Sequence, residues 1–234
     1  MKNNTGRFIT MVAICLGLMI SLHMPCADAQ TLKELSVEWW QWAVSIPTSA
    51  NPLTDTTGTD CLVGQRGATW FLAGVLAGGP VSRTCSIPQG RMLFFPIINI
   101  VSINTPNVCG SINESAAQLR ADIAPFIDGA SKLSLTVDNK EVKILLQRVK
   151  STVFAVALPE DNIFNAVCGG PGSVPAGIYS PAVADGFYVD LPPLTVGKHT
   201  ISFHAENRGD PSKSSDDFVL DVTYNLTVVP VSLQ

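Results

Sequence analysis

The sequence has few of the residue patterns that catalytic and metal sites need. It contains three histidines, and His199 and His204 lie five positions apart on one predicted strand, so they face opposite sides of a sheet. No two cysteines have the C-x-x-C spacing of a zinc site. P-loop, G-x-G-x-x-G, H-E-x-x-H, EF-hand and G-x-S-x-G patterns are also missing. We therefore expect no metal and no cofactor, and we lean against an enzyme.

Charge is scarce as well. Charged residues make up 15% of the chain, the formal net charge is −4, and no basic cluster stands out. A nucleic-acid-binding protein needs such a cluster, so we expect no nucleic-acid partner. After residue 30 no apolar run is long enough to span a bilayer, so we expect no transmembrane segment in the mature chain. Hydrophobic residues reach 46%, which indicates a packed core rather than disorder.

The first 29 residues have the pattern of a cleavable signal peptide. Lys2 and Arg7 precede an apolar stretch, and Ala27-Asp28-Ala29 is a small-x-small cleavage motif. Cleavage after Ala29 would leave Gln30 as the first residue of an extracytoplasmic protein, periplasmic or secreted. The alternatives are a membrane anchor, for which the stretch is short, and a lipoprotein modified at Cys26.

Four cysteines remain in the mature chain, namely Cys61, Cys85, Cys109 and Cys168. An even number in an exported chain indicates two disulfides. Three pairings are possible, and we favour Cys61–Cys85 with Cys109–Cys168, which joins neighbours in the sequence.

Two helices are predicted from capping boxes. Thr31 and Glu34 open one that runs to residue 46, and Ser111 and Glu114 open another that ends at Pro125 and Gly129. The first helix has two apolar stripes: Trp39 and Trp42 lie on the main one, and Trp40 lies on the second. We expect all three in the core, with the helix between two layers. The alternative is that Trp40 faces a ligand or a partner.

The rest of the chain reads as short strands, with a tight hairpin at residues 88–90 and a long Gly/Pro loop at 162–186. Residues 93–98 are continuously apolar and should be covered on both faces. The pattern predicts a mainly β protein: an antiparallel β-sandwich at residues 131–234, with a helix-plus-strand module and a second short helix at 30–130. The two parts could also form one continuous domain. The predicted strands are residues 68–75, 81–87, 91–100, 133–137, 142–146, 152–158, 187–191, 199–203 and 218–228.

Several segments resemble a family of exported bacterial proteins of unknown function. They are Glu38-Trp39-Trp40-Gln41-Trp42-Ala43, Gly64-Gln65-Arg66-Gly67 leading into Trp70-Phe71-Leu72-Ala73-Gly74, Arg83-Thr84-Cys85-Ser86-Ile87-Pro88 leading into Phe94-Phe95-Pro96, and Asp185-Gly186-Phe187-Tyr188 with Leu194-x-x-Gly197-x-His199-Thr200-Ile201. The resemblance covers most of the mature chain. It implies a bacterial, extracytoplasmic protein and supplies no activity.

Polar residues beside the apolar strands of the amino-terminal half are the best site candidates. Buried arginine and asparagine side chains must be hydrogen-bonded, and the simplest partners are loop carbonyls. The alternative is a ligand pocket. It would be lined by Trp40, Trp70, Arg66, Arg83, Asn99 and Asn104.

Three functions remain open from the sequence. The first is a non-enzymatic exported protein that binds an unknown protein or glycan partner or associates with the envelope. The second is a glycan or cell-wall hydrolase with paired carboxylates. The third is a structural accessory subunit. The acids available to a hydrolase are Glu160-Asp161, Asp216-Asp217, Asp55 and Asp60.

Overall fold

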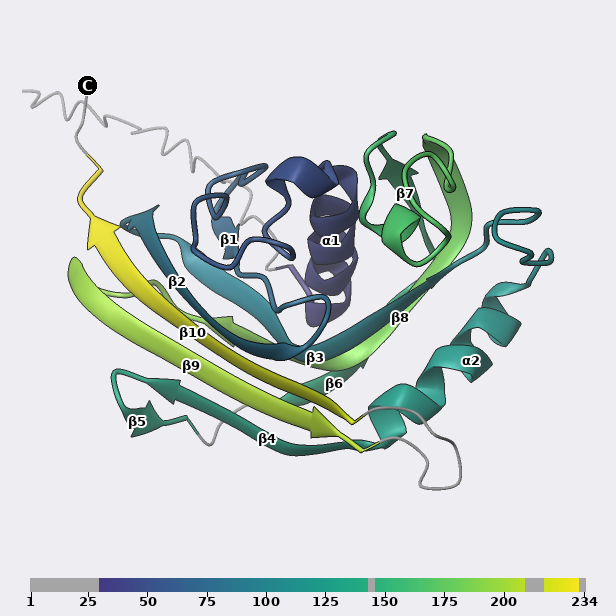
Figure 1. Ribbon diagram of the computed structural model, residues 1–234. Coiled ribbons are helices and arrows are strands. Elements are labelled where there is room, and N and C mark those ends of the chain that lie inside the picture. The colour runs from purple at the N-terminus through teal and green to yellow at the C-terminus, as the bar shows by residue number, and fades with distance from the viewer. Residues whose placement is uncertain (1–29, 143–145, 209–216, 232–234) are drawn as a thin grey trace, which may run out of the picture.

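Two β-sheets packed face to face form the body of the protein, so the predicted mainly β sandwich is confirmed (Figure 1). A computed structural model describes residues 30–142, 146–208 and 217–231. The helices of this part are α1 (Leu32–Ser45) and α2 (Ala116–Asp128), with short 3₁₀ turns η1 (Thr48–Ala50) and η2 (Ile163–Ala166). The strands are β1 (Thr69–Phe71), β2 (Gly79–Pro88), β3 (Met92–Ile103), β4 (Ala130–Val137), β5 (Lys140–Glu141), β6 (Gln147–Lys150), β7 (Phe154–Leu158), β8 (Gly177–Leu191), β9 (Gly197–Asn207) and β10 (Phe218–Val229).

Each sheet combines strands from both halves of the chain. Sheet A has the order β1-β3-β8-β6, with β7 also paired to β8, and sheet B has the order β2-β10-β9-β4-β5. The pairs β1–β3 and β2–β10 are parallel and the others are antiparallel. Strand pairing therefore runs across the 130/131 division: β2 pairs with β10, and β3 pairs with β8.

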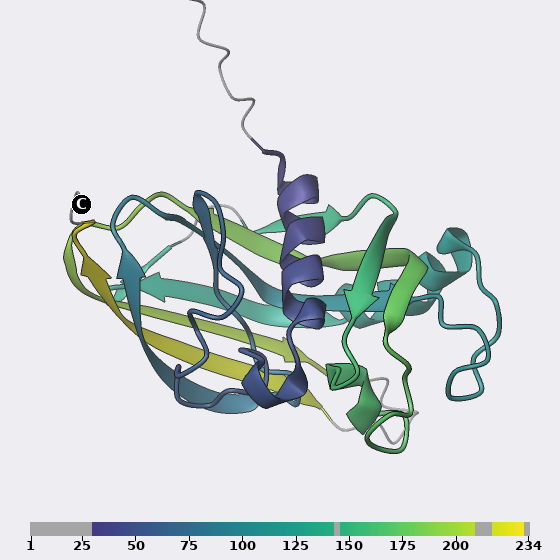
Figure 2. The same cartoon turned by 90° about the horizontal axis from the view of Figure 1, so that it is seen from above.

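Sheet A is the middle layer. On one side its Phe95 packs against Phe203 of sheet B, with ring centroids 5.2 Å apart. On the other side Phe94 stacks on Tyr188 under α1. This double covering explains the continuous apolar run in β3, as predicted. Seen from above, α1 lies across the strands, with β7 beside it (Figure 2).

Helix α1 begins and ends where the sequence predicts. Thr31 accepts a hydrogen bond from the Glu34 amide, and the Glu34 carboxylate accepts one from the Thr31 amide at 2.8 Å. Pro47 follows the last turn. Trp39, Trp40 and Trp42 are all buried, so the prediction that they lie in the core is confirmed. The helix does not lie between two layers, however: it forms the layer outside sheet A, and Lys33, Glu38 and Gln41 on its far side are exposed.

Helix α2 differs from its prediction at both ends. Its N-cap is Ser115, paired with Gln118 in a capping box, and not Ser111. Ser111 instead bonds loop carbonyls, such as that of Val108. Pro125 lies inside the helix, which continues to Asp128. The fixed φ of proline suits a helix, although its missing N–H removes one helical hydrogen bond. Burial of Ile127 keeps the last turn in place.

The predicted hairpin at residues 88–90 is wrong. Gly90, with a φ of 84°, makes the turn, but β2 and β3 belong to different sheets. The turn therefore carries the chain across the sandwich. The strand predicted at residues 68–75 is also shorter, because after Phe71 the Ala73 and Gly74 carbonyls accept hydrogen bonds from Arg83 instead of joining the sheet.

The long loop predicted at residues 162–186 is only partly a loop. Strand β8 begins at Gly177 and pairs with β3 on one edge and with β7 and β6 on the other. Its Gly and Pro residues look like loop residues in isolation, and only these neighbours make the segment a strand.

The favoured disulfide pairing is confirmed. Cys61–Cys85 ties the loop after η1 to β2, and Cys109–Cys168 joins the loop after β3 to the loop after η2. In the described part of the chain, no helix combines the length and apolarity needed to cross a membrane.

Candidate functional site

The six side chains proposed as a pocket do not form one site. Trp40, Trp70, Arg83 and Asn104 are buried. Asn99 is half-buried, and Arg66 is exposed. Of the six, Trp40 and Asn99 line the same pocket, which lies along β3.

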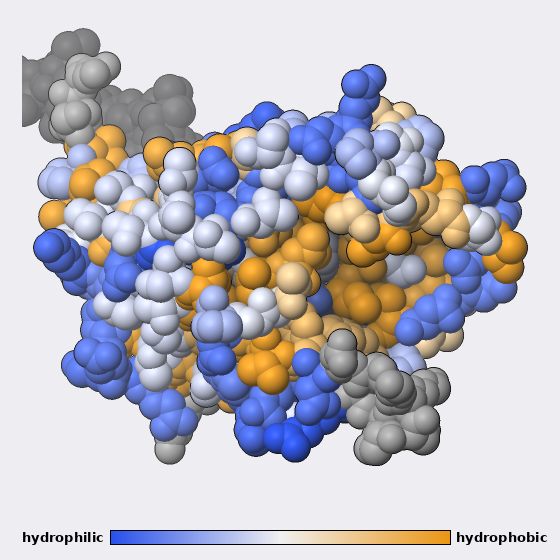
Figure 3. Space-filling model, in the orientation of Figure 1, coloured by the Kyte–Doolittle hydropathy of each residue, from blue (hydrophilic) through white to orange (hydrophobic). Residues whose placement is uncertain are grey.

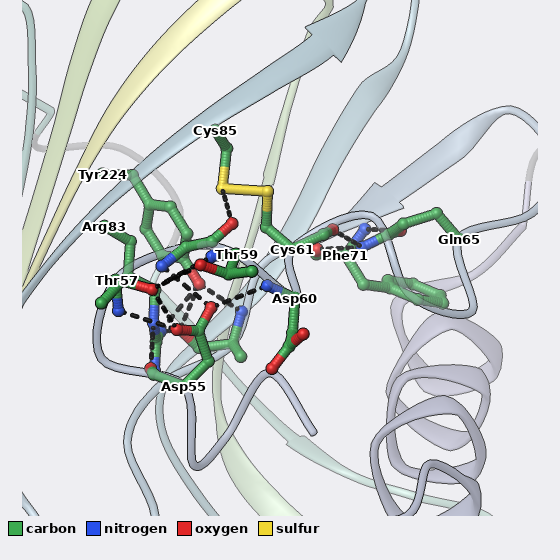
Figure 4. Close-up of a disulfide and its surroundings, with 12 residues drawn as sticks. Asp55, Thr57, Thr59, Asp60, Cys61, Gln65, Phe71, Arg83, Cys85 and Tyr224 are labelled. Carbon is green, nitrogen blue, oxygen red and sulfur yellow. Dashed lines mark hydrogen bonds between the residues drawn. A yellow bond between two sulfur atoms is a disulfide. The ribbon is translucent and has the colours of Figure 1, made fainter. Parts of the chain in front are cut away.

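Arg83 is held entirely by the protein. Its guanidinium donates to the carbonyls of Asp55, Ala73 and Gly74 at 2.7–2.8 Å and to the Tyr224 hydroxyl at 2.8 Å. Figure 4 shows this cluster beside the Cys61–Cys85 disulfide. With 1% of its surface exposed, Arg83 supports two loops and is closed to a ligand.

Asp55 is committed to its own loop. Its carboxylate accepts hydrogen bonds from the amides of Thr57, Gly58 and Asp60 at 2.7–3.0 Å (Figure 4). Burial by itself would raise the pKa of Asp55, but these hydrogen bonds outweigh it and hold the pKa below its usual value. A carboxylate with this many donors is suited to shaping a turn.

Asn104 and Trp70 are also enclosed by other parts of the protein. Asn104 accepts from the Glu114 amide at 2.9 Å and donates to Asn113 at 2.8 Å, which closes the loop between β3 and α2. Trp70 is packed between the sheets. Its indole N–H is the buried side-chain donor that finds no acceptor in the described residues.

An apolar pocket of about 300 Å³ lies beside the second half of β3. Six consecutive residues of the strand, from Pro96 to Val101, line it. Trp40, Leu76, Phe126 and Phe164 come from the surrounding elements. On the face shown in Figure 3, apolar residues gather around a hollow between the β7 side and α2. Ligand pockets have this composition: mostly apolar walls with a few placed polar groups.

The polar groups of this pocket belong to one network. The Trp40 indole and the Asn99 amide both donate to the Tyr188 hydroxyl, at 3.2 and 3.3 Å. Tyr188 is fully buried behind them, and burial raises its pKa, so the phenol stays protonated. Within the described chain the other end of the Asn99 amide has no hydrogen-bond partner, which leaves one polar group at the pocket wall.

The pocket coincides with an open strand edge. β1 pairs with β3 only from Met92 to Phe94, while β8 pairs with β3 as far as Ile103. In an antiparallel pair, half of a strand's N–H and C=O groups point away from the neighbour. From Pro96 onward, no described strand pairs with these outward groups. The strand therefore presents unpaired backbone groups inside an apolar hollow, which we call the β3 groove.

A second apolar pocket of about 180 Å³ continues the β3 groove toward the end of the strand. Val101, Ser102 and Ile103 line it from β3, and Val108, Phe164 and Cys168 close it from the two loops that the Cys109–Cys168 disulfide joins. Val101 and Phe164 line both pockets. They therefore form the partition between them.

Arg66 lies in a different cleft, of about 810 Å³, beside α1 and β7. Its walls include Glu38, Gln41 and Trp42. Gln41 bonds the Ala155 carbonyl, and the Trp42 indole bonds that of Val63. The Gln41 amide nitrogen and the Trp42 indole therefore already have protein partners.

Among the described acids proposed for a hydrolase, only the neighbours Glu160 and Asp161 line a common pocket. Glu160 and Asp161 are consecutive and line one open pocket, where no other acid of the described chain lines the wall. Asp161 accepts from the Ser49 amide at 3.0 Å. Asp217 is exposed, and Asp216 lies outside the described residues. In the described part no three metal-ligating side chains come together.

Tyr188 and Phe164 were missed by the sequence analysis. Tyr188 sits in an alternating strand like any core residue, and its contact with Trp40 joins positions 148 residues apart. Phe164 is an isolated aromatic residue in a Gly/Pro-rich loop, and Asn162 and Asn165 on either side were the available signal. Comparison with known proteins does not add to this description, because no protein-family model and no curated protein matches the chain.

Proposed function

We propose that this protein is a non-enzymatic extracytoplasmic binding protein that captures an extended segment of a partner polypeptide along the β3 groove. The observation that carries the proposal is the open edge of β3 from Pro96 to Ile103. A polypeptide added as a strand supplies donors and acceptors at the spacing of these backbone groups.

The surroundings of the edge support this choice. Proteins usually shorten, charge or cover a strand edge, because an apolar open edge invites other strands. Here two apolar pockets flank the edge. A purely apolar ligand would leave the buried backbone groups unpaired, which costs free energy.

The compartment is part of the same proposal. Two disulfides fit a protein that folds outside the reducing cytoplasm. The signal peptide expected at residues 1–29 lies outside the described residues. Export would place the β3 groove among envelope or secreted proteins, which agrees with the family resemblance noted for the sequence.

Amide hydrogen exchange tests the proposal directly. We would select displayed decapeptides on oxidised protein comprising residues 30–234 and then follow exchange by NMR. Bound peptide should slow exchange at the amides of residues 98–103 that point away from β8. Failure to select any peptide with a Kd below about 100 µM, or protection around Arg66 instead, would contradict the proposal.

Two controls separate strand addition from general apolar binding. Val101→Lys places a charge in the β3 groove and should weaken binding at least tenfold, whereas Val153→Lys, at an exposed position, should not. Peptide N-methylated at alternate amides should lose affinity if the backbone pairs. Equal binding of methylated and unmethylated peptides would contradict strand addition, and this test needs no change to the protein.

A further inference from the structure

The two pockets of the β3 groove lie in line along one strand. The larger pocket is lined by residues 96–101 of β3, and the smaller pocket by residues 101–103 of the same strand. Beyond the bulge between Pro96 and Ile98, Asn99, Val101 and Ile103 lie on one face, because side chains alternate. Asn99 faces the larger pocket, Ile103 the smaller, and Val101 the partition.

This arrangement sets a spacing for anything that pairs with β3. Asn99 and Ile103 are four positions apart, which is about 13 Å in an extended strand. A paired segment would direct two of its side chains, four residues apart, into the two pockets. The side chain midway between them would meet Val101 and Phe164.

The pockets also set the chemistry of those side chains. No charged residue of the described chain lines either pocket. A charge brought into them would lose its hydration without gaining an ion pair, which is strongly unfavourable. At about 300 Å³ the larger pocket has twice the volume of an engineered cavity that holds benzene, so it accepts a large apolar side chain.

Phe164 is firmly held in its position as the partition. Asn162 accepts a hydrogen bond from the Phe164 amide and donates to the Pro159 and Val174 carbonyls at 2.9 Å. Asn165 bonds the Glu160 carbonyl and the Val174 amide. The Cys109–Cys168 disulfide secures the same loop.

We infer that the captured segment is uncharged and carries two apolar side chains four residues apart, with a small residue midway that Phe164 selects. This inference rests on the proposed strand capture and names the class of segment captured. Phe164 then acts as a specificity-determining residue: it rejects a large side chain two positions from the first anchor.

Synthetic peptides test the spacing. In a ten-residue threonine-rich host, two leucines at i and i+4 should bind at least tenfold more tightly than two leucines at i and i+2. Phe164→Ala should join the pockets and remove that preference. Val196→Ala, a truncation at an exposed position before β9 that lines neither pocket, should keep it. Replacing either leucine by lysine should abolish binding.

The outcomes separate this inference from the proposed function. Equal binding of the two spacings to the wild-type protein, or an unchanged preference in Phe164→Ala, would overturn the spacing rule even if selected peptides still protect the β3 amides. Tight binding of the lysine peptides would overturn the charge rule. If Phe164→Ala fails to fold, the wild-type preference for i and i+4 still decides the spacing.

Discussion

Buried arginine is tolerated only where its N–H groups find acceptors, and Arg83 meets that condition with three carbonyls and a hydroxyl. We predict that Arg83→Met destabilises the protein by about 3–5 kcal/mol, because several buried acceptors lose their donor. The exposed Arg66 provides the matched control, and Arg66→Met should stay within about 0.5 kcal/mol. Urea unfolding of both variants measures the difference, and similar losses would contradict this account.

Trp40 and Trp39 are both enclosed, although they point in different directions from α1. Trp39 donates to the Leu72 carbonyl at 3.0 Å, and Trp40 donates to Tyr188. We predict that alanine at either position costs about 3–5 kcal/mol, as for other large truncations in a packed core. Unfolding free energies from denaturant titration check this. A Trp40→Ala protein as stable as wild type would show that its stripe is not a packed layer.

Within the strands, Gly186 allows β8 to approach β3 beside Asn99. A Cβ at Gly186 would lie 2.5 Å from the Asn99 Cβ and 2.8 Å from its Cα, and neither can move freely. We predict that Gly186→Ala costs about 1–3 kcal/mol and displaces Asn99 from the pocket wall. Gly177→Ala on the same strand, whose nearest contact is the Tyr179 ring at 3.7 Å, should cost nothing measurable. Thermal unfolding compares the two variants.

The turn between β4 and β5 is tied to β9 by a pH-dependent contact. His199 Nδ1 lies 2.8 Å from an Asp138 carboxylate oxygen, and Nε2 lies 2.9 Å from the Thr195 carbonyl. Both neighbours accept hydrogen bonds, so the doubly protonated ring satisfies both. The Asp138 contact raises the pKa of His199, and the His199 contact lowers the pKa of Asp138.

The sign of the pH effect follows from these directions. Because its pKa is raised, protonated His199 contributes its full stabilisation of the fold below about pH 6.5. That stabilisation is lost as pH rises through the folded-state pKa. Because its pKa is lowered, ionised Asp138 contributes its full stabilisation of the fold above about pH 3.9. That stabilisation is lost as pH falls through the folded-state pKa. We predict a melting temperature that declines from pH 6 to pH 9. Asp138→Asn, which suits the positive φ of that turn, should flatten the decline; an unchanged slope would contradict the assignment.

At the scale of the whole molecule, the two disulfides hold different parts of the sandwich. Cys61–Cys85 is buried and closes a loop of 24 residues, and Cys109–Cys168 joins positions 59 apart at the end of the β3 groove. We predict that serine pairs at either bridge lower stability by about 3–4 kcal/mol, from the entropy of the unfolded chain. Opening Cys109–Cys168 should also weaken peptide binding, measured by fluorescence anisotropy, whereas opening Cys61–Cys85 should not. Equal effects of opening either disulfide on peptide binding would contradict these separate roles.

Local patterns were read correctly where local physics decides the structure. The capping box at Thr31 and Glu34 and the strand predicted at residues 218–228 each depend on residues within a few positions. The errors arose where a distant partner decides. Gly177 to Gly186 looks like loop until β3 and β7 lie beside it, and Ser111 loses its predicted capping role to loop carbonyls.

The fold and the candidate site also differ in how much of each the sequence alone could predict. From composition and spacing alone, the sequence determined the mainly β class, because strand periodicity is a local property, and it favoured the observed disulfide pairing and the burial of the tryptophan helix over their alternatives. Only the tertiary structure decided that Arg83 is enclosed, that Trp40 and Asn99 meet at Tyr188, and that β3 is left open from Pro96 onward. An open edge depends on which strand is missing beside it, and that is settled by how distant strands pair across the whole sheet.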